Sequence, residues 1–254
     1  HGVHAYMDDV MTLDGLSAKV NTAAQQAAAL YTGYTGRISV NVKDGAAGGS
    51  AVRLDGDVLA QDAQGRIDVA FADSSSYLKG LAFGDGTINM WLQNGAAWHN
   101  ANHAATLPQG YWGSRITSLV GGDAPERAGL IFQNEANTIV ADRYSGYTRV
   151  FYTHDAAATQ RINGGAFVIN RAAAGSGVIV ATDAAGLHTE AGASAAEKAL
   201  VDETLGALAN KLWYRGYKDG ERNLLGKVEI AEGLTAASAS KRICLLYTSD
   251  AADE

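Results

Sequence analysis

Two histidines spaced four residues apart are the strongest candidate for a metal site in this sequence. On a helix, His99 and His103 would share one face, and two imidazoles so placed can bind a divalent cation. The surrounding segment WHNANH is rich in asparagine and precedes Pro108, which favours a loop. Because no acidic third ligand lies close by, the sequence favours hydrogen-bonded or solvated histidines and predicts no cofactor.

A second group of residues is suited to binding sugars. Aromatic rings stack on the apolar faces of saccharides, while neighbouring Asn, Asp and Gln side chains supply directed hydrogen bonds. The aromatic residues that we expect in or beside turns are Trp98, Tyr111, Trp112, Tyr144 and Tyr147. The alternative is that these rings fill the core.

Motifs for catalysis are few. The sequence holds no GxSxG nucleophile elbow, no phosphate-binding P-loop and no HExxH zinc motif. His154 beside Asp155 could orient an imidazole for general-base work, but a turn at the end of a strand explains the pair equally well. Acids such as Asp142 and Asp155 would suit a polysaccharide-degrading enzyme, although no spacing singles out a pair. The sequence therefore favours a non-enzymatic role.

The elements that must position these residues begin with an expected helix over residues 8–31. Apolar residues recur there at alternating intervals of three and four, the spacing of a coiled-coil seam. The seam residues are Leu13, Leu16, Val20, Ala23, Ala27 and Leu30. We predict a short trimerisation segment over residues 1–35; the alternative is one amphipathic helix packed on its own domain.

Residues 36–190 change to an alternation of period two, with runs of about five residues separated by Gly, Asn and Asp. This pattern predicts a mainly β domain of short antiparallel strands, as a sandwich or an interleaved trimeric β-shaft, and no repeat of fixed period is detected. Residues 191–243 predict a capped helix over 194–212 and one partial strand over 227–230.

Composition limits the classes of partner. The net charge of −7 comes without a basic stripe, so the sequence does not predict binding to nucleic acid. No apolar run approaches the roughly 20 residues of a membrane span. Alanine supplies much of the 47% hydrophobic content, which predicts a thin core.

The last eleven residues, 244–254, resemble one reading frame through a transposase-type sequencing adapter. We expect them to be an arbitrary tail, with native residues missing, so they are excluded from fold reasoning. The single cysteine, Cys244, lies in this tail and therefore indicates nothing about redox compartment or disulfides.

Three segments resemble bacteriophage tail-fibre and related receptor-binding proteins. Residues 11–32 are similar to a short linker of those fibres, and residues 92–108 are similar to their segments that carry ANH and end in a proline. Residues 144–155 resemble the strand-turn-strand units that end fibre repeats. The resemblance implies an elongated, β-rich homotrimer on the virion that works with other tail proteins and attaches to a host-surface glycan.

We therefore expect a structural, adhesin-like fibre protein, located on a phage tail or otherwise outside the cell or at its surface. Two alternatives are a β-rich polysaccharide depolymerase, acting as a glycoside hydrolase or lyase, and a carbohydrate-binding β-sandwich module.

Overall fold

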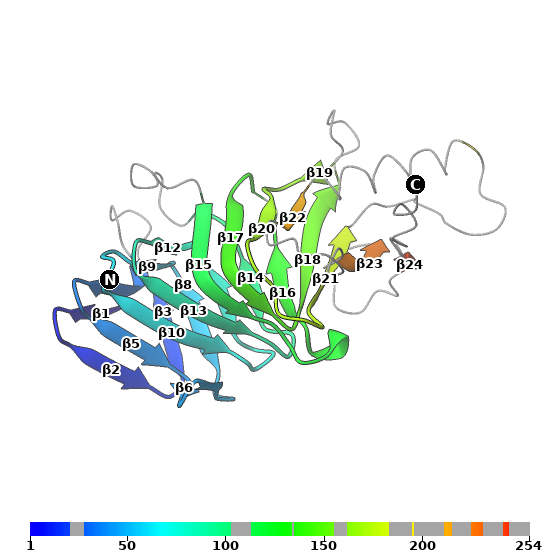
Figure 1. Cartoon of the computed structure of the whole chain (residues 1–254). Coiled ribbons are helices and arrows are strands. Elements are labelled where there is room, and N and C mark those ends of the chain that lie inside the picture. The colour runs from blue at the N-terminus through cyan, green and yellow to red at the C-terminus, as the bar shows by residue number, and fades with distance from the viewer. Residues whose placement is uncertain are drawn as a thin grey trace.

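The structure is a computed structural model that describes residues 1–20, 28–102, 113–133, 135–154, 162–182, 195, 211–214, 225–230 and 241–243. Within these residues the chain winds through three parallel sheets, here called A, B and C, and most of their strands follow one another in that order (Figure 1). One passage of the chain through the sheets is called a rung. Stacked rungs of this kind form a parallel β-solenoid, in which each rung pairs with its neighbours.

The strands of each sheet are stacked in chain order. Sheet A contains β1 (Val3–Tyr6), β4 (Ala28–Gly33), β9 (Asp57–Ala60) and β12 (Ala82–Gly84). Sheet B contains β2 (Val10–Leu13), β5 (Arg37–Val40), β10 (Arg66–Phe71), β13 (Thr87–Leu92), β15 (Gly113–Val120), β17 (Thr138–Ser145), β20 (Phe167–Ile169) and β22 (Leu212–Tyr214). Sheet C contains β3 (Leu16–Lys19), β8 (Val52–Asp55), β11 (Tyr77–Lys79), β14 (Ala97–His99), β16 (Gly129–Phe132), β18 (Tyr147–His154), β21 (Gly177–Thr182), β23 (Leu225–Ile230) and β24 (Lys241–Ile243).

A few short elements interrupt this winding. A hairpin joins β6 (Val42–Lys43) to β7 (Ala46–Ala47), and β19 (Ile162–Asn163) pairs with β18. These two pairs and β23–β24 are antiparallel, whereas the other strand pairs of the described residues are parallel. A 3-10 turn, η1, spans Pro125–Arg127.

The core lies inside the coil, and in many strands alternate residues point inward. In β10, Ile67 and Val69 are fully buried, whereas Arg66, the residue before Ile67, is exposed. Register stacks like on like, so that Ile67 lies between Ile38 of β5 and Ile88 of β13. Each rung covers the next: Met11 in the first rung is half-buried, but its partner Ile38 in the second is 1% exposed.

The length of a rung varies along the coil. Partners in sheet B lie 29 residues apart from Ile38 to Ile67, but only 21 apart from Ile67 to Ile88. From Ser118 to Arg143 the interval is 25 residues. Since corners and loops of different length separate the strands, the sequence shows no constant period even though the structure repeats.

The β-rich character predicted from the alternation is confirmed, but the antiparallel arrangement is wrong. The alternation reports only that one face of a strand is buried, which holds for parallel and antiparallel strands alike. The turn signals misled as well. Asn94 and Gly95 have positive φ angles of 53° and 78°, as in a tight hairpin, yet they carry the chain from sheet B to sheet C.

The predicted helix over residues 8–31 is also wrong, and with it the trimerisation seam. Its described part contains β2, β3 and the start of β4, with Gly15 at a φ of 71° in the turn between β2 and β3. Leu13, Leu16 and Leu30 lie in sheets B, C and A respectively, so they form no common stripe. Val20 is buried just after β3, whereas Ala23 and Ala27 lie outside the described residues.

At the other end, almost all of the helix predicted over residues 194–212 lies outside the described residues, and its last residue begins β22. The strand predicted over residues 227–230 is part of β23. Sheets A, B and C each contain strands from both sides of residue 35, where the predicted N-terminal segment ends. The tail at 244–254 lies outside the described residues. Among the described residues, no helix is long and apolar enough to cross a membrane.

Candidate functional site

The most distinctive feature of the solenoid is the place where sheet A stops. Among the described residues sheet A ends at β12, and in the following rung β15 contacts both β12 of sheet A and β13 of sheet B. Near its start, the Ser114 hydroxyl accepts a hydrogen bond from the backbone N–H of Ala82 in β12 at 3.0 Å. Further along, Ser118 pairs with Asn89 of β13. Beyond this point the described strands of the coil belong to sheets B and C, apart from the short β19.

β15 and the following strand β17 bend together. In both strands two successive residues avoid the core, Thr117 and Ser118 in β15 and Asp142 and Arg143 in β17. The two strands keep one register on either side of these residues, as expected for bends that match. Figure 1 shows both as long, curved strands beside the end of sheet A.

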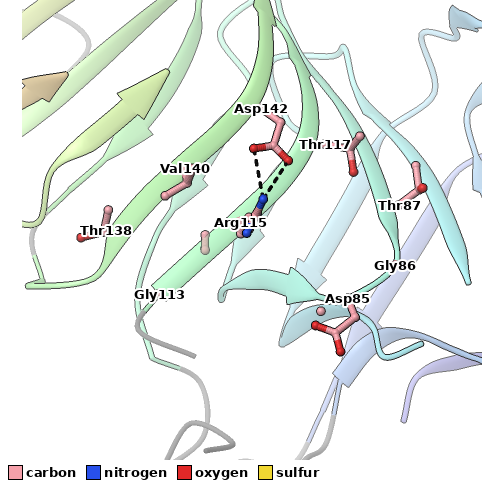
Figure 2. Close-up of a pocket in the computed structure, with 11 residues that line it drawn as sticks. Asp85, Gly86, Thr87, Gly113, Arg115, Thr117, Thr138, Val140 and Asp142 are labelled. Atoms are coloured by element: carbon pink, nitrogen blue, oxygen red, sulfur yellow. Dashed lines mark hydrogen bonds and ion pairs between the residues drawn. The ribbon is translucent and has the colours of Figure 1, made fainter. Parts of the chain in front are cut away.

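A groove of about 630 Å³ lies on the outer face of these strands, a volume typical of ligand sites. Its wall on the side of sheet A is the corner between β12 and β13, and its floor comes from β15 and β17 (Figure 2). The groove is lined by Gly84, Asp85, Gly86, Thr87, Gly113, Ser114, Arg115, Thr117, Thr138, Val140 and Asp142. Its polar side chains carry hydroxyl, carboxylate and guanidinium groups, beside the apolar Val140 and three glycines.

The charged centre of the groove is the pair Arg115 and Asp142. One guanidinium nitrogen, Nη2, lies 3.5 and 3.4 Å from the two carboxylate oxygens, and Figure 2 shows the side chains facing each other. Asn170 donates a second, shorter hydrogen bond of 2.7 Å to Oδ1 of Asp142. The Arg115 side chain remains 66% exposed and that of Asp142 34% exposed, so both are accessible to a ligand.

Two glycines allow the backbone to approach closely at the groove. Gly84 and Gly113 have φ angles of 134° and 145°, which side chains rarely adopt. A Cβ atom at Gly113 would collide with the backbone of Thr138, and one at Gly84 with that of Ala60. The wall and the floor of the groove thus depend on glycine at these two positions.

A buried network of amides supports the floor from within. The hydroxyl of Ser114 donates to Oδ1 of Asn100 at 2.6 Å, and Nδ2 of Asn100 donates to Oε1 of Gln133 at 2.6 Å. Nε2 of Gln133 in turn donates to the carbonyl groups of Asn137 and Gly165. These side chains satisfy polar backbone groups where the chain turns between sheets, and so fix the start of β15.

Two aromatic residues predicted to contact a ligand lie in the core instead. Trp98 is fully buried and donates its indole N–H to the carbonyl oxygen of Gly80 at 3.0 Å. Tyr144 is 2% exposed, and its hydroxyl is shared between Thr148 at 2.9 Å and the carbonyl oxygen of Gly177 at 2.6 Å. Burial raises the pKa of Tyr144 far above its usual value. Both rings therefore have a packing role.

The remaining predicted aromatics are placed differently. Tyr147 is half-buried at the first position of β18, on sheet C rather than beside the groove. Tyr111 and Trp112 lie outside the described residues and immediately precede Gly113, which lines the groove. Their predicted contact with a ligand stays a prediction.

His99 belongs to a stack of rings on the outer face of sheet C. Its ring lies 4.5 Å from that of Phe132 with 7° between the planes, and Phe132 lies 4.9 Å from Phe151 with 11° between the planes. Burial and, to a lesser degree, the charge of Lys79 lower the pKa of His99, which favours the neutral ring. The rings of His99 and Phe151 cover the two faces of the Phe132 ring, so neither face is open to a sugar.

The candidate metal site at His99 and His103 is not tested, because His103 lies outside the described residues. Among the residues that are described, no group of three or more His, Cys, Asp or Glu side chains could hold a metal ion.

Sequence reasoning missed most of the groove. Of its lining residues only Asp142 was singled out as a candidate catalytic acid. Arg115 and Asp142 lie 27 residues apart, and only the length of one rung brings them together. The pairing of residues 113–120 with residues 138–145 would have indicated the groove. Because the rungs differ in length, no constant period in the sequence reveals this pairing.

Comparison of the chain with protein-family models, with curated proteins and with solved structures finds no match.

Proposed function

We propose that this chain is a glycan-binding β-solenoid that holds an extended saccharide in the groove on sheet B, as part of a fibre that attaches to a cell surface. The observation that carries the proposal is the groove itself, which is large enough for a ligand and lined by hydroxyl and charged side chains. Saccharides are recognised by such groups because each sugar hydroxyl both donates and accepts hydrogen bonds.

The regular spacing of the sheet supports an extended ligand. Neighbouring strands lie about 4.8 Å apart, close to the length of one sugar ring, so successive strands can meet successive units of a polymer. Polar residues that line the groove lie on three neighbouring strands of sheet B: Thr87 on β13, Thr117 on β15 and Asp142 on β17.

The sequence resemblance alone supports three further parts of this proposal: the location on a phage tail, the homotrimer, and the other tail proteins as partners. An attachment role fits a chain whose rungs stack along one axis, because such a coil presents its outer faces along its whole length.

Binding to a panel of immobilised polysaccharides tests the proposal. Thr138→Trp places a bulky ring on the groove floor, so we expect it to weaken binding by roughly tenfold or more. Thr12→Trp is the matched control, because Thr12 is exposed on the same face of sheet B but in the first rung. Equal affinities for the two variants, or no polysaccharide bound by the wild type, would refute the proposal.

A depolymerase is the second candidate, because two carboxylates, Asp85 and Asp142, line the same groove. Glycoside hydrolysis requires two acids that flank the scissile bond. This alternative predicts that the wild type releases reducing ends from a bound polymer and that Asp85→Asn abolishes the release. A wild type that binds the polymer and leaves its length unchanged would exclude hydrolysis. Asp155, the other acid considered, lies outside the described residues.

A further inference from the structure

The outer face of sheet B carries the same three-residue cluster twice. In the first cluster, Nε of Arg66 donates to Oδ2 of Asp68 at 2.7 Å, and Nδ2 of Asn89 donates to Oδ1 of Asp68 at 2.7 Å. This cluster joins β10 to β13, and none of its members lines the groove. It serves as an internal reference for what an arginine, an aspartate and an asparagine do on this surface.

The second cluster differs from the first in its arginine, which lies on the strand next to that of the aspartate rather than on the same strand. Nδ2 of Asn170 donates to Oδ1 of Asp142 at 2.7 Å, as Asn89 does to Asp68. Arg115, however, approaches Asp142 only to 3.4 Å, well beyond the roughly 2.7–2.9 Å of a strong charge-assisted hydrogen bond. The arginine that lies in the groove is thus the one that is loosely held.

This looseness leaves hydrogen-bonding capacity facing the groove. A guanidinium has five N–H donors and a carboxylate about four acceptor positions. The contacts of Arg115 with Asp142 involve Nη2 alone, and the short bond to Asp142 comes from Asn170. The N–H donors of Arg115 and the carboxylate acceptors of Asp142 therefore lie side by side. This arrangement suits two adjacent hydroxyl groups of one sugar ring, because a hydroxyl can both accept a hydrogen bond from the guanidinium and donate one to the carboxylate.

Charge favours a neutral ligand over an acidic one. The groove is lined by two aspartates, Asp85 and Asp142, against one arginine, Arg115. The whole chain carries a formal net charge of −7, three charges of which come from Asp250, Asp253 and Glu254 in the tail, and the remaining negative charge would also repel a polyanion at long range. An acidic sugar placed on Arg115 would also bring its carboxylate beside that of Asp142.

We infer that the groove selects a neutral saccharide that presents a vicinal diol, held between Arg115 and Asp142, and that it rejects uronate and sulfated polymers. This inference rests on the proposed glycan binding and names the substrate class of the same groove. Asp142 acts as the acceptor for the diol, Arg115 as the donor, and Asn170 keeps the carboxylate in place.

The test compares neutral with acidic polysaccharides on the wild type and on three variants. The neutral probes are a glucan, a galactomannan and a xylan, and the acidic probes are polygalacturonate, alginate and chondroitin sulfate. We expect binding to a neutral probe alone, and Asp142→Asn and Arg115→Gln should each weaken it roughly tenfold or more. Asp68→Asn, the same change in the reference cluster, should leave the affinity unchanged.

The outcomes separate the two proposals. Binding of an acidic polymer in preference to the neutral ones would overturn the inference and leave glycan binding intact. Neutral binding that is unaffected by both Asp142→Asn and Arg115→Gln would also overturn it. If neither class of polymer binds at all, the proposed function itself fails. Because the Arg115 side chain is 66% exposed, Arg115→Gln is expected to fold, which keeps the test decisive even if Asp142→Asn does not.

Discussion

The hydroxyl of Ser114 accepts a hydrogen bond from the backbone N–H of Ala82 at 3.0 Å and thereby ties β15 to the last strand of sheet A. The same hydroxyl donates to Asn100, so one side chain links the end of a sheet to the buried amide network. The groove depends on this link, because β15 forms its floor where sheet A stops.

Ser114→Ala is therefore expected to reduce the free energy of unfolding by about 1–3 kcal/mol, since it leaves a buried N–H and a buried amide oxygen without partners. Urea denaturation measures the loss. Ser118→Ala, on the outer side of the same strand, is the control and should change stability by less than about 0.5 kcal/mol. Equal effects of the two substitutions would show that the link is unimportant.

Tyr144→Phe is expected to cost about 1 kcal/mol of stability and to leave polysaccharide binding unchanged. The phenol is buried, and its hydroxyl bonds to Thr148 and Gly177 inside the coil. Thermal unfolding and a binding assay on one preparation measure both effects. Tyr147→Phe, a change at a half-buried position, is the comparison for stability. A loss of binding by Tyr144→Phe without any loss of stability would restore the ligand contact predicted from the sequence.

The stability of the protein should depend on His99 at mildly acidic pH. The folded-state pKa of His99 lies below its ordinary value of 6.5, chiefly because of burial, so the unfolded chain binds the proton more readily. The stabilisation is present above pH 6.5 and is lost as the pH falls from there through the folded-state pKa. Chemical denaturation at a series of pH values between 7 and 5 measures this dependence.

His99→Phe provides the control for this prediction. Phenylalanine preserves the stack on Phe132, whose ring lies 4.5 Å from that of His99, but it cannot bind a proton. The variant should lose less stability than the wild type over the same pH range. Parallel pH profiles for the two proteins would mean that His99 does not contribute.

The alternation of buried and exposed residues allowed the β-strands to be predicted, but not their partners. Asp44 and Gly45, with φ angles of 51° and 78°, close a true hairpin between β6 and β7. Asn94 and Gly95 have nearly the same angles, yet they turn a corner between two sheets. Local turn chemistry is the same in both, and only the stacking of rungs decides which strand becomes the neighbour.

The apolar spacing of residues 13–30 shows the same ambiguity. Leu13, Leu16 and Val20 have the intervals of a helical seam, but in the structure they lie in β2, in β3 and just after β3. The groove was beyond prediction for a related reason. It joins β12, β15 and β17, and their proximity depends on rung lengths that vary between 21 and 29 residues over β5 to β17.

The central claim is that a neutral saccharide binds in the groove. Its most direct test is an NMR titration of the protein with a neutral oligosaccharide, followed through side-chain methyl signals. Binding in the groove predicts shifts at Thr87, Thr117, Thr138 and Val140, which line it. The methyl signals of Leu130 on the outer face of sheet C should stay unchanged. Shifts at Leu130 with an unaltered groove would contradict the account and place the ligand on the opposite sheet.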